Sequence, residues 1–171
     1  TRDPSSAASD VYKRQADGLI LRVNDHKTII SASKLSHLPV INALSNLSHP
    51  CQCLAGLMTL LEERGSLEKL NIVWMGPITN VANSWIEAFK KELGFSLNIF
   101  CPEAWFEKYK KKMQEYDIST DLDDILHHHI NDQILAHADA VMTDTWKSMG
   151  EDTKNLDYDL IKEFRVTEKV M

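Results

Sequence analysis

Short apolar runs alternate along this chain with longer segments in which apolar residues recur every three or four positions. The short runs predict buried strands at residues 18–23, 39–43, 71–75, 97–100 and 140–143. The longer segments predict helices over residues 26–37, 49–64, 80–93, 102–116 and 158–164. Strands that alternate with helices are typical of βαβ units, so the pattern predicts an α/β fold with a parallel sheet.

The helix that follows His49 has the clearest boundaries. Pro50 suits the first helical position, because its φ is already helical and its missing N–H would lack a partner there anyway. Gly65 favours a helix end. His49 then lies at the mouth of the helix, with Gln52 on nearly the same face beside unpaired backbone N–H groups. This arrangement can bind the carbonyl oxygen of an activated acyl group, although a capped surface helix has the same spacing.

Length and composition narrow the class of protein. With 171 residues, 43% of them hydrophobic and 26% charged, the chain suits one ordinary globular domain. Its net charge of −6 argues against nucleic acid as a partner, and no apolar run approaches the ~20 residues that span a bilayer. The three cysteines, Cys51, Cys53 and Cys101, lack C-x-x-C spacing, which favours reduced thiols in a cytoplasmic protein.

Two segments differ from this pattern. Residues 1–15 are small, polar and aperiodic, and their end looks like a translated sequencing adapter, so we expect a non-native leader outside the fold. The chain also stops in a charged stretch at Met171, and we therefore expect an internal fragment of a longer gene product. The run His127, His128 and His129 invites a metal site. Successive residues point in different directions and no second ligand pair is near in sequence, so we predict none.

Three segments resemble the aspartate/ornithine transcarbamylases, in the order in which that family has them. The segment that begins at His49 resembles the family's His-Pro-x-Gln motif. Residues 143–150 resemble the Asp-x-Trp-x-Ser-Met-Gly loop that binds ornithine in the ornithine carbamoyltransferases. Between them, residues 76–86 occupy the place of the Gly-Asp-Gly-Asn-Asn-Val-Ala-x-Ser segment. The resemblance covers nearly everything from residue 16 to residue 171.

The resemblance implies two parts of a larger fold. Residues 16–48 would be the carboxy-terminal part of a carbamoyl-phosphate-binding domain, and residues 49–65 the interdomain helix. Residues 66–171 would form a truncated, three-layer, parallel-sheet, Rossmann-like ornithine-binding domain. The family's Ser-x-Arg-Thr-Arg phosphate-binding motif does not occur in the chain, so we expect the chain alone to be inactive.

The resemblance also implies a reaction without cofactor or metal. The carbamoyl group of carbamoyl phosphate would pass to the δ-amine of L-ornithine, giving L-citrulline and phosphate. Arg22, His49 and Gln52 would bind carbamoyl phosphate and stabilise the charge that builds on its carbonyl oxygen. No nucleophilic thiol is needed, so Cys51 and Cys53 are predicted to be packing residues.

The second substrate would be held by residues further along the chain. By the resemblance, Asp144, Asn80 and Ser148 hold the α-amino and carboxylate end of ornithine, while Met149 and Gly150 shape the loop over it. These residues follow predicted strands, where ligands bind in parallel α/β sheets. Small-molecule substrates are therefore the expected partners, and the resemblance implies a homotrimer for the full-length protein.

The chain departs from the family pattern at several positions. The turn Gly76-Pro77-Ile78-Thr79 replaces Gly-Asp-Gly-Asn, and Pro77 fixes φ and removes an N–H. Gly56 stands in mid-helix where the family usually has Asp, and residues 125–130 look like extra sequence. These departures leave open a transcarbamylase for another amine, such as putrescine or a modified ornithine, and a catalytically silent metabolite-binding paralogue. A nicotinamide-binding domain is disfavoured, because no G-x-G-x-x-G segment follows any strand.

Overall fold

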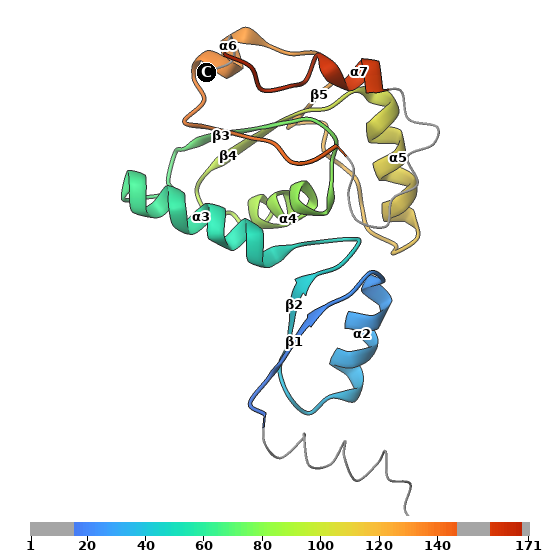
Figure 1. Cartoon of the computed structure of the whole chain (residues 1–171). Helices are drawn as coiled ribbons and strands as arrows, with labels where there is room; N and C mark the ends of the chain where they lie inside the picture. The colour runs from blue at the N-terminus through green and yellow to red at the C-terminus, as the bar shows by residue number, and fades with distance from the viewer. Residues whose placement is uncertain (1–15, 147–157, 169–171) are drawn as a thin grey trace, which may run out of the picture.

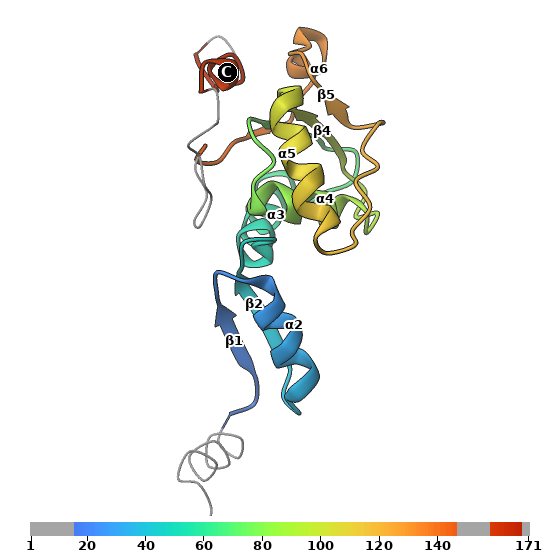
Figure 2. The same cartoon turned by 90° about the vertical axis from the view of Figure 1, so that its right-hand side faces the viewer.

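The computed structural model describes residues 16–146 and 158–168, which form two α/β units joined by one long helix (Figure 1). The first unit holds a parallel pair of strands and one helix, in the order β1 (Leu19–Arg22), α2 (His26–Leu35) and β2 (Val40–Leu44). Seen from the side, this unit is a separate lobe beyond the end of the long helix (Figure 2). Two strands and one helix bury little, and Ile29 and Leu44 are its only buried apolar residues up to the end of β2 in the described part.

The joining helix is α3 (Pro50–Arg64), and it begins and ends as its sequence predicts. His49 is the residue before its first turn, and Pro50 occupies the first helical position. Gly65 follows the last turn with a left-handed φ of 74°, which a glycine adopts without steric cost. The helix thereby carries the chain from the end of β2 to the start of the second unit.

The second unit contains a four-stranded parallel sheet in the order β5-β4-β3-β6. Its strands are β3 (Asn71–Met75), β4 (Ser96–Phe100), β5 (Leu126–His127) and β6 (Ala140–Met142). Its helices are α4 (Asn80–Phe89), α5 (Glu103–Gln114), α6 (Asp132–Ala136) and α7 (Tyr158–Lys162). The strands connect through helices in the βαβ manner that the alternating pattern predicts.

The sheet is covered on both faces, which makes three layers. Ile72 and Trp74 pack with α3, α4 and α5, whereas Val73 and Met75 pack on the opposite face with α6 and Phe164. Figure 1 shows α3 and α4 on one side of β3 and β4, and α6 on the other. A strand buried on both faces is continuously apolar rather than alternating, as β3 is from Ile72 to Met75. The predicted three-layer, parallel-sheet, Rossmann-like fold is confirmed.

Two short elements are not predicted by the sequence pattern. Residues 125–130, which look like extra sequence, contain the edge strand β5, and α6 follows directly at Asp132. Neither is long enough to show a period. The helix predicted over residues 80–93 ends at Phe89, because Glu92 and Gly94 adopt left-handed φ values of 55° and 92° in the turn that follows. The other predicted boundaries agree to within two or three residues.

Gly56 is explained by the packing of α3 on α4. A Cβ atom at residue 56 would lie 2.6 Å from Cζ2 of Trp85, far inside van der Waals contact. The Trp85 side chain is itself 3% exposed and belongs to the core on that face of the sheet. The sequence shows only the helix-propensity cost of this glycine, whereas the structure shows that Trp85 occupies the space of any side chain there.

Polar contacts hold the first unit against the second. The Nδ2 atom of Asn46 lies 3.2 Å from the hydroxyl oxygen of Tyr116, which follows α5. The same tyrosine ring meets the His26 ring edge-on, with ring centroids 5.8 Å apart. Further along, Asn80 Nδ2 donates to the backbone carbonyl of Ser45 at 2.8 Å. The two units are therefore joined by α3 and by a small set of hydrogen bonds beside it.

Candidate functional site

The candidate site lies at the mouth of α3, where the ends of both sheets meet. The backbone N–H of His49 donates to Ser84 Oγ of α4 at 2.8 Å, which fixes the entry of α3 against the second unit. The His49 side chain does not cap its helix, and its Nδ1 atom is buried without a hydrogen-bond partner among the described residues. A buried, unpaired polar atom costs free energy, and a functional site is one place where proteins retain such an atom.

Two charged side chains from different units act on the His49 imidazole. Burial and the nearby Arg22 guanidinium lower the pKa of His49 below its ordinary value of 6.5, while the Asp144 carboxylate acts in the opposite direction. Arg22 ends β1 in the first unit, and Asp144 follows β6 in the second. The ring is therefore neutral near pH 7 and offers one donor and one acceptor. The structure thus brings together three predicted site residues that are far apart in sequence.

Asp144 is held on both carboxylate oxygens. Thr79 Oγ1 donates to Asp144 Oδ2 at 3.1 Å, and the backbone N–H of Thr145 donates to Oδ1 at 2.7 Å. Thr79 also caps α4, since its hydroxyl oxygen accepts from the N–H of Ala82 at 3.4 Å. One threonine hydroxyl therefore connects the start of α4 to the carboxylate that follows β6.

The turn at Gly76–Thr79, whose sequence departs from the family pattern, is closed by hydrogen bonds to its own backbone. The Pro77 carbonyl accepts from the buried Trp74 indole N–H at 3.0 Å and from the Thr79 N–H at 3.0 Å. Gly76 enters the turn with a φ of 118°, which only glycine adopts readily. The strand end next to it is tied as well, because Thr143 Oγ1 donates to the Met75 carbonyl at 2.8 Å. The turn has a defined shape set by the core of the second unit.

Asn80 lies beside this turn but is already engaged. Its side chain is 7% exposed, and Nδ2 donates to the Ser45 carbonyl. In the described structure Asn80 therefore helps to join the units. Its predicted role in binding the acceptor amine stays a prediction.

Two predictions at the mouth of α3 need correction. The N–H groups of Gln52 and Cys53 both donate to the His49 carbonyl, at 3.1 and 3.3 Å, so these two donors are not unpaired. Cys51 is exposed and is no core residue, whereas Cys53 is buried and packs as predicted. Burial raises the pKa of the Cys53 thiol to about 12, which leaves it protonated and unreactive. The Gln52 side chain is exposed in the first turn, and its role stays a prediction.

The remaining predicted acceptor residues, Ser148, Met149 and Gly150, lie outside the described residues. Conversely, Ser84 and Thr79 hold the site together but carry no predicted role. Both stand in the segment at residues 76–86 that resembles the family, and Asn80 and Ser84 have the spacing of one helix face. That spacing was a usable signal for Ser84, since its hydroxyl meets His49.

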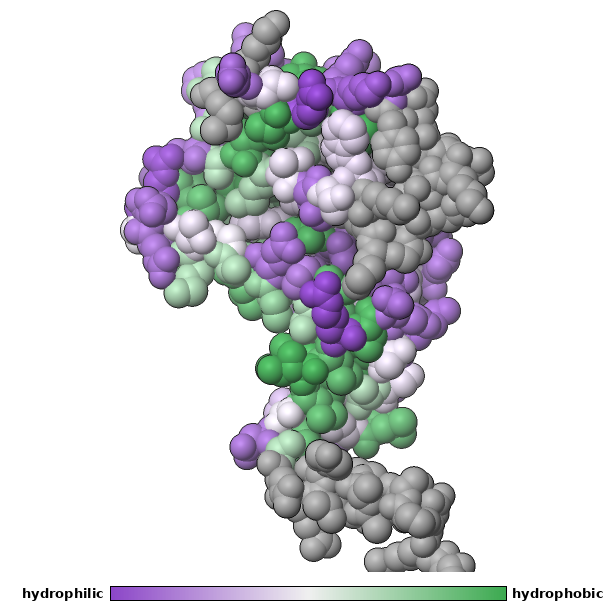
Figure 3. Space-filling view, in the orientation of Figure 1, coloured by the Kyte–Doolittle hydropathy of each residue, from purple (hydrophilic) through white to green (hydrophobic). Residues whose placement is uncertain are grey.

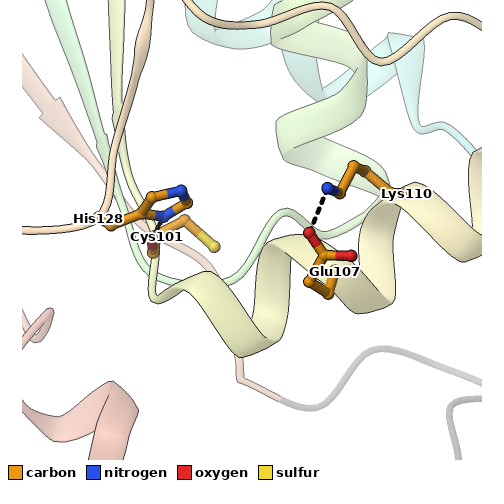
Figure 4. A network of polar contacts seen from close by, with 4 residues as sticks. All are labelled: Cys101, Glu107, Lys110 and His128. Carbon is orange, nitrogen blue, oxygen red and sulfur yellow. Dashed lines mark hydrogen bonds and ion pairs between the residues drawn. The ribbon is translucent and has the colours of Figure 1, made fainter.

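The histidine run is engaged in separate contacts. His127 Nε2 lies 2.9 Å from Asn98 Oδ1, and His128 Nδ1 lies 3.0 Å from the Cys101 carbonyl. Figure 4 shows His128 beside Cys101, with the ion pair of Glu107 and Lys110 on the neighbouring helix. Within residues 16–146 and 158–168, no three His, Cys, Asp or Glu side chains gather as metal ligands would. None of the described helices has the length and apolar character needed to cross a membrane.

Comparisons with known proteins match both units. The family model described as aspartate/ornithine carbamoyltransferase, carbamoyl-P binding domain, matches residues 3–62. The model described as aspartate/ornithine carbamoyltransferase, Asp/Orn binding domain, matches residues 68–171. The first match begins inside the segment that the sequence analysis sets apart as a leader, and the origin of that segment stays a prediction.

Several curated relatives are named ornithine carbamoyltransferase. An ornithine carbamoyltransferase of Geobacter metallireducens is 34% identical over 157 residues, which are 88% of this chain and 48% of that protein. One from Acinetobacter baumannii is 33% identical over 170 residues, covering 99% of this chain and 53% of its own length. One from Desulfotalea psychrophila is 41% identical over 103 residues, or 60% of this chain and 34% of the relative. The chain thus spans about a third to a half of these relatives.

Solved structures agree with this match. The ornithine carbamoyltransferase from Pyrococcus furiosus superposes with a TM-score of 0.72 at 29% identity, covering 99% of this chain and 55% of that one. The anabolic ornithine carbamoyltransferase from Campylobacter jejuni gives 0.68 at 30% identity, covering 100% of this chain and 57% of that one. A putative aspartate carbamoyltransferase from Trypanosoma cruzi gives 0.59 at 18% identity over 84% of this chain and 51% of its own, which shows the fold alone.

Proposed function

The chain belongs to the aspartate/ornithine carbamoyltransferase family, and we propose that its complete gene product transfers a carbamoyl group from carbamoyl phosphate to the δ-amine of L-ornithine. The observation that carries the proposal is the meeting of Arg22, His49 and Asp144 at the mouth of α3. Arg22 contributes a positive charge, His49 a neutral imidazole and Asp144 a negative charge, and both charged groups act on the imidazole. That is the charge pattern needed to hold an anionic carbamoyl donor beside a cationic amino acid.

The first half of the site suits the carbamoyl donor. The Arg22 guanidinium is exposed and permanently charged, so it can bind phosphate oxygens or the carbonyl oxygen. The neutral His49 ring can donate one hydrogen bond to the carbonyl oxygen as charge builds there. Gln52, exposed one turn into α3, completes the predicted set. Such donors stabilise the transition state without a covalent intermediate.

The second half suits the amine acceptor. We propose that Asp144 binds the α-ammonium group of ornithine, with Asn80, Ser148 and Met149 completing the subsite. The relatives that are 33–41% identical to this chain are named ornithine carbamoyltransferase, and this name supports ornithine as the acceptor. The δ-amine has a reference pKa near 10, so the site must favour its neutral, attacking form by positioning it against the carbamoyl carbon.

Assembly and location belong to the same proposal. We propose that the complete gene product forms a homotrimer in the cytoplasm. We expect the 171-residue chain to make no citrulline by itself. All three cysteines lie in the described part as free thiols, which agrees with a reducing compartment. Production of citrulline by the purified chain would contradict the expected inactivity.

A second candidate is a carbamoyltransferase for a different amine. The rigid Gly76–Thr79 turn favours it, since the resembled segment has a carboxylate and a second glycine there. Putrescine lacks the α-carboxylate and α-ammonium groups of ornithine. A site built around Asp144 would therefore bind putrescine less tightly than ornithine, so ornithine remains the proposed acceptor.

One assay separates these candidates. The complete gene product is incubated with carbamoyl phosphate and, in turn, ornithine, putrescine or aspartate, and kcat/KM is measured for each acceptor. We expect ornithine to give the highest value, and Arg22→Gln to lower kcat/KM by about 100-fold or more. The matched control is Arg64→Gln, which removes an exposed arginine from the far end of α3, where its Nη2 donates to the Asp139 carbonyl. A higher kcat/KM for another amine, or tight ornithine binding without turnover, would overturn the proposal.

A further inference from the structure

We propose that Thr79 is a positioning residue that sets the orientation of the Asp144 carboxylate and thereby the affinity for the acceptor's α-ammonium group. The inference rests on the proposed function and adds a residue to it. The Thr79 hydroxyl lies 3.1 Å from Asp144 Oδ2 and 3.4 Å from the N–H of Ala82. The side chain is 3% exposed, so water does not compete freely for either contact.

The direction of both hydrogen bonds follows from the groups involved. A carboxylate can only accept, so the single hydroxyl proton of Thr79 points at Asp144. The hydroxyl oxygen keeps its lone pairs, and one of them accepts the N–H of Ala82 at the start of α4. Both bonds are therefore made at once, and each fixes the rotation of the hydroxyl for the other.

The Asp144 carboxylate is thus tied at both ends and still open to a ligand. Oδ2 accepts from Thr79, and Oδ1 accepts from the Thr145 backbone N–H at 2.7 Å. Each oxygen of a carboxylate has two acceptor positions, so with the contacts made among the described residues one on each oxygen is left for an ammonium group. A carboxylate with a fixed plane offers these positions in one direction, which lowers the ordering cost of binding.

The turn before Thr79 holds it in place. The Pro77 carbonyl accepts from both the Trp74 indole and the Thr79 N–H, each at 3.0 Å. Pro77 itself has a fixed φ, and the Trp74 ring is 2% exposed in the core of the second unit. The position of the Thr79 hydroxyl is therefore set by β3 and the core, not by a mobile loop.

The test uses the complete gene product with two Thr79 variants. Thr79→Val keeps the shape of the side chain and removes the hydroxyl, whereas Thr79→Ser keeps the hydroxyl. The control for the lost helix cap is Asn131→Ala at α6, because Asn131 caps its helix through the N–H groups of Gln133 and Ile134 without contacting the site. KM for each substrate, kcat, the Ki of L-norvaline and the thermal midpoint are measured for all four proteins.

We expect Thr79→Val to raise KM for ornithine and Ki for L-norvaline by about 10-fold each, with KM for carbamoyl phosphate within about 2-fold of wild type. L-Norvaline keeps the α-ammonium and α-carboxylate groups but lacks the δ-amine, so it reports on the amino-acid end of the acceptor subsite without the reacting amine. Thr79→Ser should restore both values, and Asn131→Ala should lower the thermal midpoint without changing either.

Four results would overturn the inference. Equal ornithine KM in Thr79→Val and wild type would remove the positioning role while leaving the proposed function intact. An equal rise in KM for both substrates, or failure of Thr79→Ser to restore the ornithine KM, would show a structural role only. A wild-type protein that neither turns over nor binds ornithine would overturn the proposed function, and the inference with it.

Discussion

The two units of this chain position their site residues in different ways. The second unit buries a continuous core on both faces of its sheet, with Ile72, Val73 and Met75 fully inaccessible to solvent. In the first unit Ile20 is 71% exposed and Ile41 48% exposed, and hydrophobic side chains gather openly over β1 and β2 (Figure 3). Asp144 is held by hydrogen bonds from Thr79 and Thr145, and Thr79 is itself buried in the second unit. The position of Arg22 depends instead on the two strands β1 and β2 and on the contacts that join the two units.

This difference shows how much the geometry of the site depends on the contacts between the two units. Arg22 and Asp144 act on the same imidazole only while the first unit keeps its place against the second. That place depends on α3 and on contacts made by His26, Asn46 and Tyr116. Hydrogen bonds of this kind contribute about 1 kcal/mol each, far less than a buried core. The carbamoyl half of the site is therefore the one more easily displaced.

The largest effect should come from the core of the second unit. Ile72→Ala removes a fully buried side chain and should lower the free energy of unfolding by about 2–5 kcal/mol, from lost burial and the cavity left behind. The matched change Ile20→Ala in the first unit should cost no more than ~0.5 kcal/mol, since that side chain is 71% exposed. Chemical denaturation followed by circular dichroism measures both. Similar losses for the two variants would contradict the contrast between the units.

A smaller effect should come from the helix that joins the units. Gly56→Val places a branched side chain against Trp85, and we expect a loss of about 1–3 kcal/mol from overpacking between α3 and α4. The control Ala55→Val introduces the same side chain at the neighbouring exposed position, where only the helix-propensity cost applies. The same denaturation experiment applies. Equal stability of the two variants would mean that α3 moves away from Trp85 at little cost.

The smallest effect is electrostatic and reports on both units at once. Arg22→Gln should raise the pKa of His49, because it removes a neighbouring positive charge, whereas Asp144→Asn should lower that pKa further. An NMR titration of the His49 ring measures both shifts, with Arg64→Gln as the control at the far end of α3. Shifts in the same direction, or none, would show that one unit does not reach the ring.

The sign of the linked stability effect follows from the same pKa. His49 in the folded chain has a pKa below the ordinary 6.5, so between these two values the unfolded chain binds more protons. The contribution of His49 to stability is therefore complete above pH 6.5 and is lost as the pH falls through that window towards the folded pKa. Arg22→Gln should narrow the window, because it raises the folded pKa towards the unfolded one.

The order of elements could be predicted from local pattern alone. The bounds of the strand β3 and the helix α3 were predicted to within one residue, because each has a clear apolar run or clear end signals at Pro50 and Gly65. The edge strand β5 and the helix α6 could not be predicted, since two and five residues are too short for a period. The residues of the site could be named from motif resemblance, but their contacts could not.

The amino-acid sequence by itself determined the α/β fold, the family and the identity of Arg22, His49 and Asp144 as candidates. These depend on hydrophobic period, proline and glycine chemistry and motif order, all of which are local. Only the tertiary structure decided that Thr79 meets Asp144, that Gly56 makes room for Trp85 and that Asn80 is engaged by Ser45. Each of these joins residues that local rules treat separately, because a contact depends on how whole elements pack.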